Sequence, residues 1–400
     1  MKTKAIIHIG GGYLQLPSVR WAKELGLTVV LTDRTTDPSC RQLVKVFKII
    51  DGTDVTGLLK LSREVNENYE LVGVYASCDF GLKSAAAIAE AIGLPGCSPV
   101  AVERALEKNV SKEIWLRESI PTPDGMVVKD MGGLSSAEKE LDLPVIVKPA
   151  NSSGSCGVRS VWDSRDFKRA YTNAQQFSDS VVVEKLTTGQ HIDVNGLFIE
   201  GEFIGCGMMD RFFSEPPYHY SIWGCQPCSV TKEQQRAIYC VVERAARVLG
   251  IETGPVKADI VWTDKGPVIL ELAPRFHGDI ITANITPLAT SGSPVKAWMA
   301  YLCGKSDPIK YIKPENEKFA GWMALFADSC GKLLSVDGLD EVKQKSGIHD
   351  FFISFKLGSI INDSKDNRSM CGFVWAAGAN RDEVFGKLSV ASKTIRFNTA

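Results

Sequence analysis

The sequence has almost no net charge and lacks the long apolar run of a membrane protein. Lys and Arg total 46 against 47 Asp and Glu, so the net charge of −1 gives no electrostatic basis for binding nucleic acid or an anionic membrane surface. No stretch approaches the roughly 18 apolar residues that a membrane helix needs. We therefore expect neither nucleic acid nor a membrane among the partners.

The sequence also lacks a disulfide framework. Its eleven cysteines are scattered without regular spacing through a chain much longer than disulfide-stapled domains, which favours reduced thiols in the cytoplasm. The first residues, MKTKAIIHIGGGY, hold only a short apolar run that ends in glycines. This start indicates a first β-strand rather than a signal peptide.

Strand and helix signals alternate over the first hundred residues. Short apolar strands are predicted at 5–9, 27–31, 44–50 and 71–76. The helix over 82–92 is rich in alanine and ends at Gly93. Such alternation is typical of a parallel sheet with helices on both faces. One helical stretch is then predicted over 101–119, ended by the prolines of IPTPDG.

After about residue 120 the pattern changes to short strands joined by turns. PVIVKP, GVRSVW and SVVVEK are apolar strands, and residues 192–209 form two strands about a turn at Glu200 and Gly201. Residues 234–249 form an amphipathic helix that ends at Gly250. A strand, a tight turn and a strand follow in ADIVWTDKGPVILEL.

Asp259 and Glu271 carry the strongest physical argument for chemistry. They lie symmetrically about Lys265, so a hairpin that closes there makes them near cross-strand neighbours, with Cβ atoms roughly 5 Å apart. Like charges so placed need a cation, and Mg²⁺ prefers one or two carboxylates plus nucleotide phosphates. Lys257 shares their face by period-two alternation, and Arg275 follows on the next loop. The alternative is two exposed acids on a solvated hairpin.

A second element is the loop in PVIVKPANSSGSCGVRSV. A strand delivers Lys148, and residues 151–157 form a loop of small residues before the next strand. Gly154 and Gly157 let backbone N–H groups approach phosphate oxygens closely. The alternative is a flexible hairpin loop.

A third element is VVVEKLTTGQHIDV. An apolar strand runs into Glu184 and Lys185, and a glycine-containing turn leads to His191. A free strand edge here would offer backbone groups to a purine. Glu184 or His191 would then reach the exocyclic amine or the ribose.

In this order, the elements resemble the ATP-grasp superfamily over about residues 4–380. IIHIGGG, VVLTDR and GVYASCDFGLKSAAAIAEAIGLPGCSP are similar to its amino-terminal domain. The resemblance implies an α/β fold with an N-terminal Rossmann-like (preATP-grasp) domain, a mobile lid subdomain and a C-terminal α+β region. The expected boundaries are 1–106, 107–305 with a lid at about 115–182, and 306–400.

The resemblance also implies an ATP site. The lysine of the family's DK motif matches Lys108, although the preceding acid is Glu107, and the lid lysine matches Lys148. His191 stands where the family has a ribose-contacting acid. The implied ATP-binding residues are Lys108, Lys148, Ser153, Gly154, Ser155, Gly157, Glu184, Lys185, Leu186, Thr187 and His191.

The implied cofactors are ATP and Mg²⁺, with Mn²⁺ as an alternative ion. The family's metal-binding pair matches Asp259 and Glu271. A third ligand, commonly Asn two residues after the second acid, is Ala273 in this chain, which leaves the binding of a second Mg²⁺ open. The implied catalytic residues are Arg275, which steadies the transferred phosphoryl group, and Lys257.

The segment ELAPRFHGDIITANITPLATSG is similar to the L-amino-acid ligase and carbamoyl-phosphate-synthetase large-subunit-like branch. This implies a carboxylate–amine ligase that forms an amide through an acyl phosphate and releases ADP and phosphate. Small carboxylates and amines, amino-acid-like in kind, are the implied partners, and a homodimer is the implied assembly. The expected substrate-binding residues are Arg211, His277, Gly278 and Asp279.

Three questions stay open at this stage. The aromatic residues Tyr218, His219 and Trp223 either shape the substrate pocket or pack in the core. A carboxylase-type ATP-grasp enzyme that activates bicarbonate is an alternative function. A non-catalytic ATP-binding protein is another; Ala273 favours it, whereas the lysines, acids and arginine argue against it.

Overall fold

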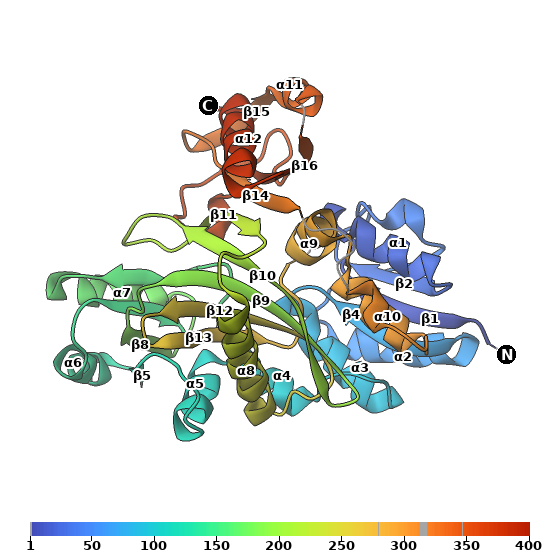
Figure 1. Ribbon diagram of the computed structural model, residues 1–400, viewed down its shortest axis with the longest axis horizontal. Helices are drawn as coiled ribbons and strands as arrows, with labels where there is room; N and C mark the ends of the chain where they lie inside the picture. The colour runs from blue at the N-terminus through green and yellow to red at the C-terminus, as the bar shows by residue number, and fades with distance from the viewer. Residues whose placement is uncertain (1, 279, 313–317, 346) are drawn as a thin grey trace.

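The computed structural model describes residues 2–278, 280–312, 318–345 and 347–400. Within these ranges the chain forms four β-sheets (Figure 1). A large antiparallel sheet lies in the centre, a parallel sheet to its right and a small lid sheet to its left. The carboxyl-terminal elements lie above the central sheet. No helix in the described ranges is long and apolar enough to cross a membrane.

The N-terminal sheet is parallel, as the alternation predicts, in the order β3-β2-β1-β4. Its strands are β1 (Lys4–Ile9), β2 (Thr28–Asp33), β3 (Val46–Ile49) and β4 (Glu70–Ala76). Its covering helices are α1 (Leu16–Glu24), α2 (Val55–Asn68), α3 (Leu82–Ile92) and α10 (Pro294–Leu302). Ile6 packs in one core with α1 and α10, and Ile7 packs in the other with α2 and α3. Helices cover both faces of this sheet, which explains why its strands are continuous apolar runs in the sequence.

The helix predicted over 101–119 is two helices, so that prediction is wrong. They are α4 (Pro99–Leu106) and α5 (Lys108–Arg117), and the backbone leaves the helical region at Glu107, where ψ is 100°. The Lys108 backbone N–H donates to the Ala150 carbonyl at 3.0 Å. A tertiary contact therefore sets the start of α5.

The central sheet has eight strands, all antiparallel to their neighbours, in the order β13-β12-β9-β10-β11-β14-β18-β16. The strands are β9 (Gln190–Ile199), β10 (Glu202–Phe213), β11 (Ser221–Gln226), β12 (Gly254–Thr263), β13 (Gly266–Ala273), β14 (Phe319–Leu325), β16 (Ile348–Ile353) and β18 (Gly372–Gly378). The predicted turn at Glu200 and Gly201 joins β9 to β10.

Helices cover this sheet in two places. The predicted amphipathic helix is α8 (Lys232–Leu249), which begins at a capping box of Thr231 and Gln234 and ends at Gly250. Its apolar face shares a core with Trp115 of α5 and with β9, β12 and β13. Near the other end of the sheet, α12 (Arg381–Thr394) packs against β14 and β18.

The lid is a separate four-stranded sheet in the order β5-β8-β6-β7. Its elements are β5 (Gly125–Val128), α6 (Met131–Glu140), β6 (Val145–Pro149), β7 (Arg159–Val161), α7 (Phe167–Gln175) and β8 (Val181–Lys185). Both helices pack into one core with the sheet. The glycine-containing loop 151–157 joins β6 to β7, so a separately packed unit carries the loop.

A small carboxyl-terminal sheet and several short helices complete the fold. The sheet holds β15 (Gly331–Asp337), β17 (Ile360–Ile361) and β19 (Arg396–Thr399). The short helices are η1 (Tyr13–Gln15), η2 (Arg41–Leu43), η3 (Asp79–Gly81), η4 (Ser164–Asp166), η5 (Ile280–Ile285), α9 (Thr286–Thr290), η6 (Ile309–Tyr311), α11 (Leu339–Gln344) and η7 (Asn367–Ser369). All eleven cysteines are free, as predicted.

We predict that Gly157→Ala lowers the melting temperature. Gly157 has φ +76°, and a Cβ there would lie 2.7 Å from Phe177 Cδ2 and 2.8 Å from Pro149 Cγ. Left-handed backbone alone costs an ordinary residue about 1–2 kcal/mol. Gly386→Ala in α12 is the control, because nothing lies within 4 Å of its Cβ position. Thermal unfolding measures both; equal melting temperatures would contradict the prediction.

Candidate active site

A cleft of about 440 Å³ opens between the lid, the central sheet and η3, the short helix after β4. This volume is within the range of small-molecule sites. The cleft brings together most of the residues predicted from the sequence. Those that line it are Lys108, Lys148, Ser153, Gly154, Ser155, His191, Arg211, Lys257, Asp259, Glu271, Arg275, His277 and Gly278. Asp279 lies outside the described residues.

The hairpin of β12 and β13 places Asp259 directly opposite Glu271. The prediction centred the turn on Lys265, whereas the two turn residues are Asp264 and Lys265. Asp259 still lies opposite Glu271, because β13 contains one extra residue, Leu270, at a register shift. Without this bulge Glu271 would point to the opposite face of the sheet. The bulge therefore brings both carboxylates into the cleft.

Strand β9 adds a third acid that the sequence reasoning missed. Asp259 pairs with Asp193 on one side and Glu271 on the other. The row of acids across the three strands is Glu271, Asp259 and Asp193. The row beside it is Ala273, Lys257 and Asn195. The signal for the missed pair was present, since Asp193 and Asn195 are polar residues at alternate positions of an apolar strand.

Cations separate the acids at the Glu271 end of the row. Lys257 Nζ lies 2.5 Å from Glu271 Oε1 and 3.4 Å from both oxygens of Asp259. Lys108 Nζ lies 3.4 Å from Glu271 Oε2 and donates to the Ser152 carbonyl at 2.5 Å. Lys257 thus bridges the two carboxylates, and Lys108 reaches the outer oxygen from α5.

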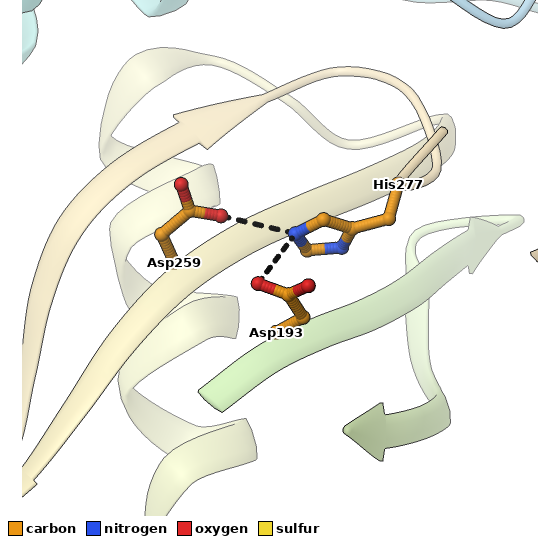
Figure 2. A group of neighbouring side chains, drawn as sticks. All are labelled: Asp193, Asp259 and His277. Atoms are coloured by element: carbon orange, nitrogen blue, oxygen red, sulfur yellow. Dashed lines mark hydrogen bonds and ion pairs between the residues drawn. The ribbon is translucent and has the colours of Figure 1, made fainter. Parts of the chain in front are cut away.

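His277 and Arg211 do the same at the Asp193 end. His277 Nε2 lies 3.0 Å from Asp259 Oδ1 and 3.4 Å from Asp193 Oδ1 (Figure 2). Arg211 Nη1 donates to Asp193 Oδ1 at 2.8 Å. The Asn195 side-chain oxygen accepts from the His277 backbone N–H at 2.8 Å and so holds the loop in place. Positive and polar groups alternate with the three acids along the row.

These contacts keep the carboxylates ionised. Burial acts to raise the pKa of Glu271, but Lys108 and Lys257 outweigh it and lower the pKa to about 2. Burial likewise opposes ionisation of Asp259, yet Lys257 and His277 hold its pKa well below the usual range. The pKa of Lys257 is raised, because the two acids outweigh its burial.

The residues present fit a divalent cation at Asp259 and Glu271. Both side chains keep 30% of their surface exposed, and both line the cleft. Their oxygens are the hard ligands that Mg²⁺ prefers. Asp193, Asp259 and His277 also offer ligand atoms within 4.8 Å of one another (Figure 2). In this second group, the Asp193 and Asp259 oxygens already contact His277 Nε2, and Asp193 Oδ1 also accepts a hydrogen bond from Arg211.

Arg275 is held by η3, the short helix that follows strand β4 of the N-terminal sheet. Its Nε donates to Asp79 Oδ1 at 2.6 Å and its Nη2 to Asp79 Oδ2 at 3.0 Å. This bidentate pair raises the pKa of Arg275 against the opposing effect of burial. Asp79 lies in η3, far from Arg275 in the sequence, and no sequence signal identified it.

The hinge residues of the lid do not line the cleft. Glu184 is buried and accepts a hydrogen bond from Lys148 Nζ, and its other oxygen lies 2.9 Å from Lys112 Nζ. Burial acts to raise the pKa of Glu184, but Lys148 and Lys112 lower it. Lys112 was not identified from the sequence. The other predicted ATP-binding residues that do not line the cleft are Gly157, Lys185, Leu186 and Thr187.

The prediction of a free strand edge at 181–185 is wrong. Strand β8 lies inside the lid sheet, with β5 on one side and β6 on the other. The backbone N–H of Lys185 donates to the Asp124 carbonyl, and that of Leu186 to the Pro144 carbonyl. These donors already have partners. The roles of Glu184 to Thr187 in binding ATP stay predictions.

One of the three aromatic residues lines the pocket, and the other two pack elsewhere as half-buried side chains. His219 lines the cleft, and burial lowers its pKa to about 4. Trp223 stacks on Phe212 with ring centroids 4.2 Å apart and lies outside the cleft. Tyr218 also lies outside the cleft and packs under the Arg159 guanidinium, 4.1 Å from the ring centroid. Of the three, only His219 contributes to the pocket.

Three family models match the chain in sequence. Residues 19–96 match the ATP-grasp N-terminal domain and residues 141–284 the ATP-grasp domain. Residues 323–400 match the L-amino acid ligase C-terminal domain 2. Together the three matched segments follow the order of the N-terminal sheet, the lid with the central sheet, and the carboxyl-terminal elements.

Individual proteins are similar at lower identity. The uncharacterized protein y4rH of Sinorhizobium fredii is 25% identical over 359 residues, covering 86% of this chain and 73% of that protein. The D-alanine–D-alanine ligase of Delftia acidovorans is 26% identical over 211 residues, covering 46% of this chain and 59% of the enzyme. The L-amino acid ligase of Bacillus licheniformis superposes over 100% of both chains with a TM-score of 0.83 and 20% identity, and so shares the fold.

We predict that Glu184→Gln destabilises the protein. The change leaves two buried ammonium groups without their carboxylate, and breaking a buried ion pair costs roughly 3–5 kcal/mol. Glu118→Gln is the control, because Glu118 pairs with Arg117 at the surface, where such pairs contribute about 0–1 kcal/mol. Thermal unfolding compares the two variants. Equal melting temperatures would show that Glu184 does not stabilise the lid.

Proposed function

Because the chain belongs to the ATP-grasp superfamily of ADP-forming ligases, we propose that it joins a carboxylate to an amine through an acyl phosphate. The observation that carries the proposal is the pairing of Asp259 with Glu271 in a cleft that also holds Lys108, Lys148 and Arg275. Phosphoryl transfer depends on positioning and on neutralising phosphate charge rather than on a protein nucleophile. This cleft provides both.

Asp259 and Glu271 are proposed to hold Mg²⁺, with Mn²⁺ as the alternative ion. When bound, the cation would neutralise charge on the nucleotide phosphates. The chain keeps both carboxylates ionised and faces them toward the cleft. It also holds them on two hydrogen-bonded strands, so their spacing is set before any ligand binds.

Lys108, Lys148 and the lid loop are proposed to bind the ATP phosphates. Both lysines line the cleft, and a phosphate would compete with Glu184 for Lys148 and with Glu271 for Lys108. The loop residue Gly154 has φ +67°, and its carbonyl accepts a hydrogen bond from the Asn367 N–H at 3.0 Å. This contact closes the lid loop against η7, which would exclude water from an acyl phosphate.

Arg275 and Lys257 are proposed to act on the reacting groups. An oxygen of the substrate carboxylate attacks the γ-phosphorus and ADP leaves; the amine nitrogen then attacks the acyl carbon and phosphate leaves. Arg275, held by Asp79, would stabilise the transferring phosphoryl group. Arg211, which lines the cleft, would recognise a substrate carboxylate.

Amino-acid-like substrates are the proposed partners. The match of residues 323–400 to an L-amino acid ligase domain and the similarity to a D-alanine–D-alanine ligase support this class. The chain spans less than two thirds of that D-alanine–D-alanine ligase, so its substrates are a proposal in their own right. His277 and Gly278 line the cleft and are proposed contacts. The homodimer stays a prediction.

The test is phosphate release from Mg-ATP across amino acids and small carboxylates, singly and in pairs. We expect release that needs one particular pair, with ADP and a new amide mass as products. Release that depends on bicarbonate, with no amine present, would show a carboxylase instead. Bound ATP without release under any mixture would contradict the ligase and favour a non-catalytic protein.

We predict that Glu271→Gln lowers phosphate release at least 100-fold, because it removes one charged metal ligand while keeping the side-chain shape; losses of this order follow removal of one stabilising group. The matched control is Asp264→Asn, an exposed acid in the turn of the same hairpin. Initial rates and circular dichroism compare the two variants. A normal rate in a folded Glu271→Gln variant would refute the metal assignment.

A further inference from the structure

Lys257 occupies the middle of the active-site face. Its neighbours across the strands are Asn195 on β9 and Ala273 on β13, and the acids Asp259 and Glu271 lie in the next row. The Lys257 side chain is only 6% exposed, whereas the two acids are 30% exposed. The ammonium therefore lies deeper than the two carboxylates in the wall of the cleft, which all three side chains line.

Ala273 gives the ammonium this position. A residue at 273 emerges beside Lys257 on the same face as Glu271, because 257 and 273 are a directly opposed pair. Alanine offers no oxygen to a cation and no bulk to displace the lysine. The Lys257 ammonium extends instead to Glu271 Oε1, which it contacts at 2.5 Å.

The other side of Asp259 does not offer a second ion site either. Asp259 Oδ1 and Asp193 Oδ1 both face His277 Nε2, at 3.0 and 3.4 Å. Asp193 Oδ1 also accepts from Arg211. A second divalent cation would have to displace either the lysine, against its positive charge, or the histidine and arginine contacts.

We propose that this site takes a single divalent cation, bound by Asp259 Oδ2 and Glu271 Oε2, and that the Lys257 ammonium permanently supplies the second positive charge. These are the carboxylate oxygens with the longer contacts, 3.4 Å to Lys257 Nζ and 3.4 Å to Lys108 Nζ. The inference rests on the proposed function and deepens it. The residues fit one ion and do not fit two. Lys257 is then a positioning residue for the carboxylates as well as a cation beside the phosphates.

The test is the number of Mn²⁺ ions bound per chain. The full-length protein is titrated with Mn²⁺ in the presence of a β,γ-imido analogue of ATP, and free Mn²⁺ is measured by electron paramagnetic resonance. We expect one bound Mn²⁺ in total for each complex of the chain with the analogue, after the Mn²⁺ held by free analogue is subtracted. Two such ions in the wild-type protein would overturn the proposal. None would overturn it together with the metal role of Asp259 and Glu271.

Two variants separate the lysine from the missing ligand. In Ala273→Asn the ammonium remains, and we expect the count to stay at one. In Lys257→Met combined with Ala273→Asn, the charge is gone and an oxygen ligand is added, and we expect two ions. A count of one in the folded double variant, as judged by circular dichroism and analogue affinity, would show that Lys257 does not exclude the second ion.

The outcome is independent of the ligase assay. A wild-type protein that binds two ions and still forms an amide would refute the single-ion site and leave the proposed function standing. A protein that binds one ion but releases no phosphate with any substrate pair would refute the function and leave the ion count standing.

Discussion

Three carboxylates in one row across adjacent strands constrain the rest of the active site. Glu271, Asp259 and Asp193 occupy directly opposed positions, where like charges repel unless cations separate them. The separating groups come from four different elements: a helix, a strand of the same sheet, a loop and a neighbouring strand. The break before α5 places Lys108, the bulge in β13 places Glu271, and the Asn195 contact places the loop that carries His277.

The same kind of pairing links the parts of the chain around the cleft. Arg275 is held by Asp79 of η3, and in the lid Glu184 holds Lys148 and Lys112. Buried ions are costly unless they are paired, so each of these charges is fixed in place by a partner. Under the proposed function, a phosphate that entered the cleft would meet cations that are already held in place. Binding would then exchange one anionic partner for another, with little loss of side-chain freedom.

Much of the site violates the patterns that build the fold. An apolar strand that carries Asp193 and Asn195, and another that carries Lys257 and Asp259, would be unstable as isolated elements of a core. Such departures from local rules are expected at functional positions. In this chain they coincide on one face of two neighbouring strands, β9 and β12. Their position side by side distinguishes a chemical site from four unrelated polar residues in apolar strands.

The sequence by itself determined most of the local elements and the hairpin that carries the central acid pair. The parallel N-terminal strands, the helix that ends at Gly93 and the turn between β12 and β13 depend on spacing within a few residues, whereas the bulge at Leu270, which sets Glu271 opposite Asp259, was not predicted. Only the tertiary structure decided the break at Glu107, the interior place of β8, and the pairing of Arg275 with Asp79. These features depend on contacts between segments distant in sequence, and a contact of that kind leaves no periodic or compositional trace in either segment alone.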